Sequence, residues 1–68
     1  MQISQRLKLL RVEKGLSQKS VAENIGLLYQ QYARYENGIN EIPVKHLITL
    51  AKFYGVSLDY LVGMTDER

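Results

Sequence analysis

The sequence predicts an all-α protein, a compact bundle of five helices in one domain that covers residues 1–68. Apolar residues recur at intervals of three and four, and no stretch alternates between polar and apolar residues as a strand would. Five glycines, at positions 15, 26, 38, 55 and 63, follow these periodic segments, where glycine commonly ends a helix. Their positions divide the chain into five short helices.

The first two helices are defined by their apolar faces. The first is expected to end near Lys14, and its apolar face consists of Ile3, Leu7 and Leu10. The second is expected at about residues 18–25, because the Ser17 hydroxyl can accept a hydrogen bond from an unpaired amide of the next turn. Its apolar stripe consists of Val21, Ala22 and Ile25.

The third helix is expected from about Leu28 to Asn37. Tyr32 and Tyr35 lie three residues apart and therefore share one face. Asn37 is followed by Gly38, and this pair of residues suits a left-handed helix end.

Two more helices complete the bundle. Pro43 fits the first turn of the fourth helix, since that position needs no amide hydrogen bond, and Gly55 ends it. Its expected buried stripe consists of Val44, Leu47, Ile48, Ala51 and Tyr54. Ser57 can cap a short fifth helix that carries Leu58 and Leu61. The polar residues 65–68 are expected to be frayed.

A sharp corner is expected between the second and third helices. Only two or three residues around Gly26 separate them, and glycine adopts the positive φ that such a turn needs. Ala22 is small enough to let the helices cross closely. The outward face of the third helix then consists of Gln30, Ala33, Arg34 and Asn37. Amide and guanidinium groups make bidentate hydrogen bonds to base edges, glutamine to adenine and arginine to guanine.

The composition of the chain restricts the other classes of function. The chain has no cysteine and a single histidine, His46, which we interpret as a surface residue, so we expect no metal site, no cofactor and no catalytic residues. No small-molecule ligand is evident. The absence of a long apolar run and of a signal peptide predicts a cytoplasmic protein without a membrane partner.

Basic residues gather near the beginning of the chain. The net charge is only +2, but residues 1–19 hold five of the nine Lys and Arg residues and one of the seven acidic residues. Such a distribution fits a solvated helix face and a phosphate-facing patch equally well.

Four groups of residues are the most specific features of the sequence: LSQ at 16–18, Ala22 with Gly26, ENG at 36–38 and GVSLDYL at 55–61. With these features, the sequence resembles the Cro/C1-type (XRE) helix-turn-helix repressors from Ile3 to Gly63. The resemblance implies a lambda-repressor-like fold with its helix-turn-helix at about residues 17–37. It also implies a non-enzymatic, sequence-specific transcriptional regulator, a repressor in preference to an activator, whose partner is double-stranded DNA.

The same resemblance assigns roles to individual residues. The residues expected to contact bases are Tyr29, Gln30 and Arg34, and those expected to contact phosphates are Gln18, Lys19, Asn37 and Lys45. Arg11 is expected to pair with Glu36. Two residues depart from the family pattern: Leu28 replaces the usual Ser or Thr cap, and the acidic Glu41 stands where relatives often carry a basic residue. Leu28 and Tyr29 can instead pack on a thymine methyl or a sugar, or add to the core.

Dimerisation would extend recognition beyond one short helix. A two-fold dimer contacts two half-sites about 34 Å apart on one face of DNA, in an inverted-repeat operator. The end of the chain carries apolar residues, and we expect a homodimer interface formed by Tyr60, Leu61 and Met64, although a simple cap on the core explains them too. The alternative function is a protein-interaction module with the same fold, such as an antitoxin or anti-repressor partner, because the net charge is small.

Overall fold

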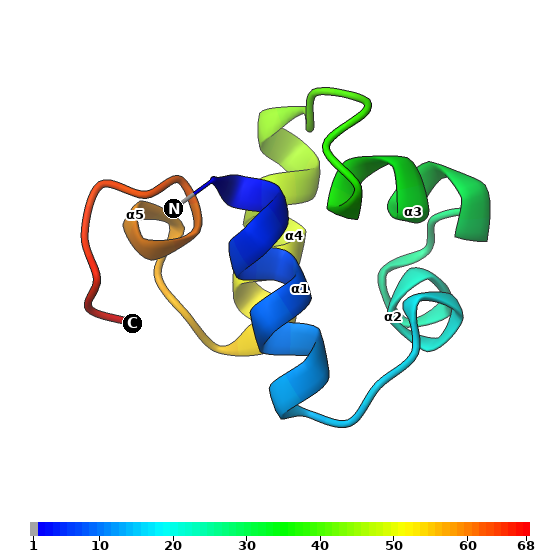
Figure 1. The fold of residues 1–68 in the computed structure, drawn as a ribbon, viewed down its shortest axis with the longest axis horizontal. Helices are drawn as coiled ribbons and strands as arrows, with labels where there is room; N and C mark the ends of the chain where they lie inside the picture. Colours follow the sequence, from blue (N-terminus) through cyan, green and yellow to red (C-terminus); the bar gives the residue numbers. More distant parts are fainter. Residues whose placement is uncertain (1) are drawn as a thin grey trace.

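The computed structural model describes residues 2–68, which form five α-helices. Figure 1 shows α1 crossing α4 near the middle of the molecule, with α2 and α3 at one end and α5 at the other. The helices are α1 (Ile3–Glu13), α2 (Gln18–Ile25), α3 (Tyr29–Glu36), α4 (Val44–Tyr54) and α5 (Leu58–Leu61). Five short helices were predicted, and these bounds agree with the expected ones to within a residue or two. Within residues 2–68, no helix has the length and hydropathy that a membrane crossing requires.

Serine caps the beginnings of α2 and α5, and glycine ends α2 and α4, as the chemistry of these residues predicts. Ser17 Oγ accepts from the Ser20 amide and Ser57 Oγ accepts from the Tyr60 amide, both at 3.0 Å. These bonds satisfy amides that have no partner inside their own helices.

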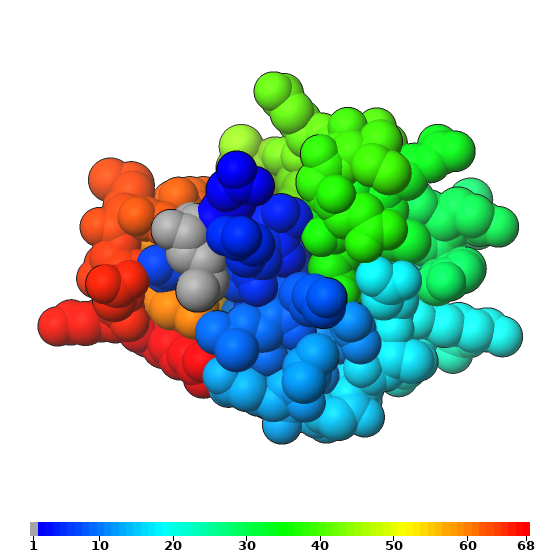
Figure 2. Space-filling model, viewed as in Figure 1, coloured from blue at the N-terminus to red at the C-terminus, as the bar shows by residue number. Residues whose placement is uncertain are grey.

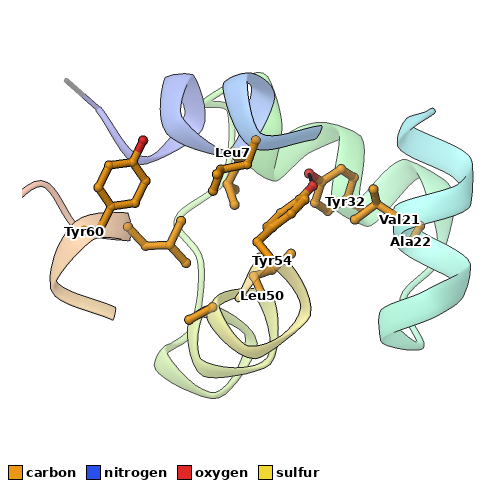
Figure 3. Packing of buried hydrophobic residues seen from close by; sticks show 10 residues of the cluster. Leu7, Val21, Ala22, Tyr32, Leu50, Tyr54 and Tyr60 are labelled. Carbon is orange, nitrogen blue, oxygen red and sulfur yellow. Dashed lines mark hydrogen bonds between the residues drawn. The ribbon is translucent and has the colours of Figure 1, made fainter. Parts of the chain in front are cut away.

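The core lies between all five helices and contains three tyrosines. Its members are Leu7, Leu10, Val21, Ala22, Tyr32, Leu50, Ala51, Tyr54, Tyr60 and Leu61. Figure 3 shows the rings of Tyr32 and Tyr54 meeting at their hydroxyl ends, where the two oxygens are 3.2 Å apart. Burial raises the pKa of both hydroxyls above the ordinary value of 10.0, because the charged form would lose its hydration. The mutual hydrogen bond supplies each buried hydroxyl with a partner.

The buried face of α4 differs from the predicted stripe. Leu47, Leu50, Ala51 and Tyr54 are buried, whereas Val44 and Ile48 are exposed. At about 100° per residue, Leu50 extends the buried arc to the side of Leu47 opposite Val44 and Ile48. The prediction was wrong for Val44 and Ile48, because the apolar residues of α4 cover more of its circumference than the core does.

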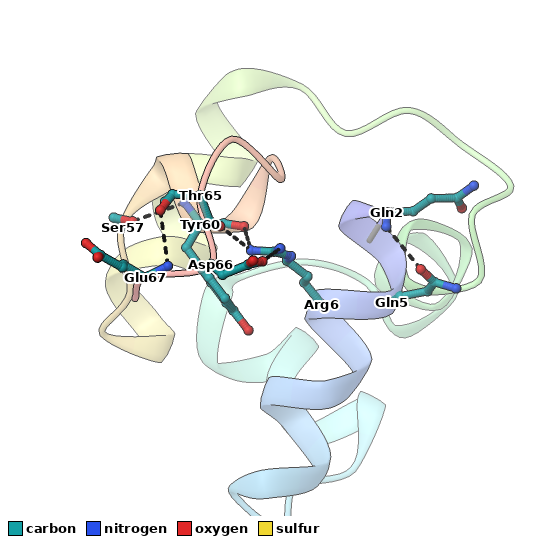
Figure 4. A network of polar contacts seen from close by, with 8 residues as sticks. All are labelled: Gln2, Gln5, Arg6, Ser57, Tyr60, Thr65, Asp66 and Glu67. Carbon is teal, nitrogen blue, oxygen red and sulfur yellow. Dashed lines mark hydrogen bonds and ion pairs between the residues drawn. The ribbon is translucent and has the colours of Figure 1, made fainter.

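The C-terminal segment is docked, although it was expected to be frayed. Arg6 is 4% exposed, and its Nη1 donates to the main-chain oxygens of Tyr60 and Thr65, each at 2.6 Å. Its Nη2 donates to Asp66 Oδ1 at 2.7 Å. Figure 4 shows the Arg6 side chain reaching from α1 to this segment. The guanidinium also lies over the ring of Tyr60, 4.3 Å from its centroid. A buried cation in α1 therefore anchors the polar residues after α5.

A second ion pair fixes the last residue of the segment. Arg68 bonds to the carboxylate of Glu13 through both terminal nitrogens, and its main-chain oxygen accepts from the Ser57 amide at 2.9 Å. The Arg68 guanidinium holds the pKa of Glu13 below its usual value. In Figure 2 the red C-terminal residues lie directly against the blue surface of α1. The expectation of fraying failed because it considered only the polarity of the segment.

Candidate nucleic-acid interface

The corner between α2 and α3 depends on the backbone of Gly26. This residue ends α2 with φ = 76°, and the Leu27 amide then donates to the Ala22 oxygen at 2.9 Å. A Cβ at Gly26 would meet no atom within 4 Å, so it is the left-handed backbone, and not a lack of space, that favours glycine. Ala22 is buried where the two helices meet. The turn is complete by Leu28, and α3 begins at the next residue.

Helix α3 is fixed on one side and open on the other. Tyr32, Tyr35 and Glu36 are buried. Three predicted site residues on the helix, Tyr29, Gln30 and Arg34, are exposed, and Asn37 at its C-terminal cap is exposed as well. Gln30, Arg34 and Asn37 follow one another at helical spacing, so they form a single stripe. Because α3 lies at the edge of the molecule, this stripe is accessible to a large partner (Figure 1).

The N-terminal end of α3 is apolar and lacks a side-chain cap. Leu28 has the extended backbone of an N-cap residue, with φ = −70°, but its side chain makes no capping hydrogen bond and is 72% exposed. Tyr29, which follows it, is half exposed. The alternative prediction, that these side chains add to the core, is wrong for Leu28, because its side chain projects into solvent.

An ion pair connects the other end of α3 to α1. Arg11 Nη2 lies 2.8 Å from Glu36 Oε1, and Arg11 Nε donates to both carboxylate oxygens at 2.9 and 3.0 Å. Arg11 Nη1 also donates to the Leu16 oxygen at 2.8 Å. The hydrogen bonds to Glu36 raise the pKa of Arg11. The resemblance implied this pair, and the structure brings the two side chains together, so that α3 is held against α1 and the segment before α2.

The four predicted phosphate-contacting residues lie on three parts of the chain. Gln18 and Lys19 are the first two residues of α2, Asn37 is the C-cap of α3, and Lys45 is the second residue of α4. Lys19, Asn37 and Lys45 are exposed, and Gln18 is partly exposed. All four therefore have surface available for an anion.

Only some of the basic residues near the N-terminus are available for a phosphate-facing patch. Arg6 and Arg11 are engaged inside the molecule, with Asp66 and Glu36 respectively. Lys8, Lys14 and Lys19 remain exposed in this part of the chain. Part of the positive charge near the N-terminus therefore has a structural role.

The structure contradicts most of the predicted dimer interface. Tyr60 is 5% exposed and Leu61 is 0% exposed, because α5 packs both residues into the core of the single chain. Neither residue therefore has appreciable surface available to a partner. Met64 is 78% exposed and is the one member of the predicted set that remains on the surface.

One contact between α3 and α4 was not predicted from the sequence. His46, interpreted as a surface residue, is partly buried, and its Nδ1 lies 3.1 Å from the Tyr35 hydroxyl. Gln31 Nε2 donates to the same hydroxyl at 3.2 Å. The spacing of Gln31 and Tyr35 indicates a local contact, but nothing in the sequence pattern indicates that His46 would join them.

Comparison with known proteins places this geometry in a family. A helix-turn-helix family model matches residues 7–61. The chain is 40% identical over 63 residues to an uncharacterized HTH-type transcriptional regulator, YobD of Bacillus subtilis, covering 93% of this chain and 56% of that protein. It is 41% identical over 65 residues to the cryptic phage CTXphi transcriptional repressor RstR of Vibrio cholerae, covering 96% of this chain and 59% of that protein. It thus spans a little over half the length of these two relatives.

A solved structure supports the same assignment. The crystal structure of a transcriptional regulator from Listeria innocua superimposes with a TM-score of 0.85 at 31% sequence identity. The alignment covers 98% of this chain and 63% of the Listeria chain. The corner at Gly26, the exposed stripe on α3 and these matches lead to one conclusion: the chain belongs to the Cro/C1-type (XRE) helix-turn-helix family of transcriptional regulators.

Proposed function

We propose that this protein is a sequence-specific repressor that binds double-stranded DNA with α3 in the major groove. One observation carries the proposal: the inner face of α3 is fixed by Tyr32, Tyr35 and Glu36, while its outer stripe is exposed. A rigidly held helix with exposed amide and guanidinium groups suits base recognition, because bidentate hydrogen bonds require defined side-chain positions. The protein would act at the nucleoid, in the cytoplasm, by occupying its operator.

The residues of the interface take two kinds of role. Tyr29, Gln30 and Arg34 contact bases, and the guanidinium of Arg34 bonds the two major-groove acceptors of a guanine. The phosphate contacts come from Gln18, Lys19, Asn37 and Lys45, on either side of α3 in the chain. Phosphate contacts fix the orientation of α3 on the duplex, and base contacts determine which sequence is bound.

We further propose that the protein binds an inverted-repeat operator as a homodimer. One eight-residue helix spans few base pairs, and a two-fold dimer doubles the number of contacts. Met64 is a large apolar side chain exposed after α5, and it is the remaining candidate contact, since Tyr60 and Leu61 belong to the core.

The experiment is selection from a random-sequence duplex library with the wild-type protein, Gln30→Ala and Arg34→Ala. The wild type is expected to enrich one motif. Arg34→Ala should lose about 1 to 3 kcal/mol of binding free energy and relax the preference at a single position. Lys52→Ala is the matched control, because Lys52 is an exposed cation in the last turn of α4. A wild-type protein that enriches no motif would contradict the proposal.

The second candidate function is binding to another protein through the same fold. Exposed apolar side chains at Ile39, Val44 and Ile48 favour it, because they could be covered by a partner. The library selection separates the two functions: a protein-binding module would enrich no DNA motif, and Arg34→Ala would leave its partner affinity unchanged.

A further inference from the structure

A chain of hydrogen bonds runs from α3 to the first turn of α4. Gln31 Nε2 donates to the Tyr35 hydroxyl at 3.2 Å, and that hydroxyl lies 3.1 Å from His46 Nδ1. The rings of Tyr35 and His46 are tilted by 49° with centroids 5.8 Å apart. Tyr35 is buried, so packing restrains its ring, and the hydroxyl contact limits the rotation of the imidazole.

The direction of these bonds determines where neutral His46 carries its proton. The Tyr35 hydroxyl has one hydrogen, and its oxygen already accepts from Gln31. Nδ1 can accept the Tyr35 hydrogen when Nδ1 itself carries none, and the ring proton is then on Nε2. In the opposite arrangement, the Tyr35 oxygen would accept two N–H bonds, and its own hydrogen would have no partner among residues 2–68. The contacts therefore favour the tautomer with an N–H donor at Nε2.

The Nε2 donor is available to a partner. It makes no hydrogen bond to residues 2–68, and it is not sealed from solvent. Lys45, adjacent to His46, and Asn37, two residues after Tyr35, are both exposed. The contact between Tyr35 and His46 thus brings three hydrogen-bond donors to the junction of α3 and α4. An acceptor with negative charge suits such a group.

We propose that His46 donates its Nε2–H to a phosphate oxygen of the DNA backbone and that Tyr35 is the positioning residue for this contact. The proposal rests on the proposed function and extends it, because it fixes the C-terminal end of α3 on the duplex through a side chain of α4. A donor that is already oriented loses little rotamer freedom on binding.

The test uses the selected duplex with single phosphates replaced by neutral methylphosphonates. Scanning both strands with wild-type protein should reveal one phosphate in each half-site whose replacement weakens binding about tenfold. This loss of affinity should depend on His46. With His46→Asn, which keeps an acceptor for Tyr35 but loses the distal donor, the same replacement should have no effect. His46→Gln, whose amide reaches the position of Nε2, should retain part of the effect. Lys52→Ala is the control, because Lys52 is exposed in the last turn of α4, at the other end of the helix from His46, and its loss should leave the effect of that replacement intact.

A second measurement needs no variant of His46. Because the chain has one histidine, imidazole nitrogen NMR of the wild-type protein reports its tautomer without ambiguity. The free protein should show the Nε2–H form, and the Nε2 proton should become protected from exchange when the duplex binds. In Tyr35→Phe the preference for the Nε2–H tautomer should disappear, and the effect of the methylphosphonate replacement on binding should become smaller. A purely structural role of Tyr35 would change neither.

The outcomes separate this inference from the proposed function. If the wild type selects no duplex, both are overturned. If the wild type binds its duplex but the tautomer is Nδ1–H, or if His46→Asn keeps the full methylphosphonate effect, the contact from His46 is overturned and the proposed function stands.

Discussion

Arg11 and Glu36 form an ion pair in which the carboxylate side chain is 1% exposed and bonds to the guanidinium through both oxygens. The pair joins the last residue of α3 to α1. Because of this position, the pair fixes the C-terminal end of α3 against α1. A charge that is buried with its partner becomes costly as soon as the partner is removed.

Removing either member of the pair should strongly destabilise the fold. Arg11→Met and Glu36→Gln should each lower the free energy of unfolding by about 3 to 5 kcal/mol, measured by urea denaturation. Arg68→Ala, which breaks the exposed pair with Glu13, is the control and should have a much smaller effect. Equal losses in the buried and exposed pairs would contradict a structural role that depends on burial.

Arg6 should hold the C-terminal segment through main-chain oxygens more than through Asp66. Arg6→Met keeps much of the side-chain volume but leaves the oxygens of Tyr60 and Thr65 without this donor, at an expected cost of about 3 kcal/mol. Hydrogen exchange at the Ser57 amide, which is bonded to the Arg68 oxygen, should become faster. Asp66→Asn should change little, because the Asp66 side chain is 98% exposed. Equal effects of the two substitutions would assign the anchoring to the ion pair.

Stability should fall at high pH because of the buried tyrosines. The pKa values of Tyr32 and Tyr54 are raised above 10.0 in the folded protein, so their contribution is complete below pH 10 and is lost as the pH rises above it. Each buried hydroxyl should lower the free energy of unfolding by about 1.4 kcal/mol per pH unit in that range. Urea denaturation between pH 9 and about 11.5 measures the slope. Tyr54→Phe should reduce it, and an unchanged slope in that variant would argue against burial of the tyrosine hydroxyls as the cause.

A side-chain cap at position 28 should stabilise α3. Leu28 already has the backbone conformation of an N-cap residue, so Leu28→Ser should raise the free energy of unfolding by about 1 kcal/mol without moving the helix. Leu28→Ala is the matched control that shortens the side chain without adding an acceptor. A gain of the same size from both would mean that loss of the exposed leucine, and not capping, is responsible.

The dimer proposal is tested at Met64. Met64→Glu should weaken self-association at least about tenfold in sedimentation equilibrium, because a carboxylate would be buried at the interface. Val12→Glu provides the comparison, since Val12 is an exposed apolar residue of α1. A dimer that survives Met64→Glu, or a wild-type protein that is already monomeric on its operator, would refute this interface.

Local sequence signals predicted the helices, and tertiary contacts determined much of the rest. Ser17, Gly26 and Ser57 act on their own turns, so their roles follow from neighbouring residues alone. Arg6 was grouped with the basic residues of α1, because the oxygens that receive its hydrogen bonds lie more than fifty residues away. No periodicity in α1 indicates those partners.

The candidate site shows the same division between features that local sequence predicts and features that tertiary contacts determine. The exposure of Gln30 and Arg34 follows from the helical spacing of α3, which places them opposite Tyr32 and Tyr35. The burial of Tyr60 and Leu61 was missed, since an amphipathic terminal helix presents the same pattern whether its apolar side meets the core or a partner. The contact of His46 with Tyr35 depends on the approach of two helices, which sequence spacing does not specify.

The internal use of arginine also affects how such a protein would search a genome. Arg6, Arg11 and Arg68, three of the nine Lys and Arg residues, are neutralised by carboxylates of the same chain. Fewer cations then remain to displace counterions from DNA, and the affinity for arbitrary sequences is lower when fewer phosphates are neutralised. Weak attraction to arbitrary DNA shortens each unproductive encounter. Discrimination between the operator and arbitrary DNA would then rest on the hydrogen bonds from α3.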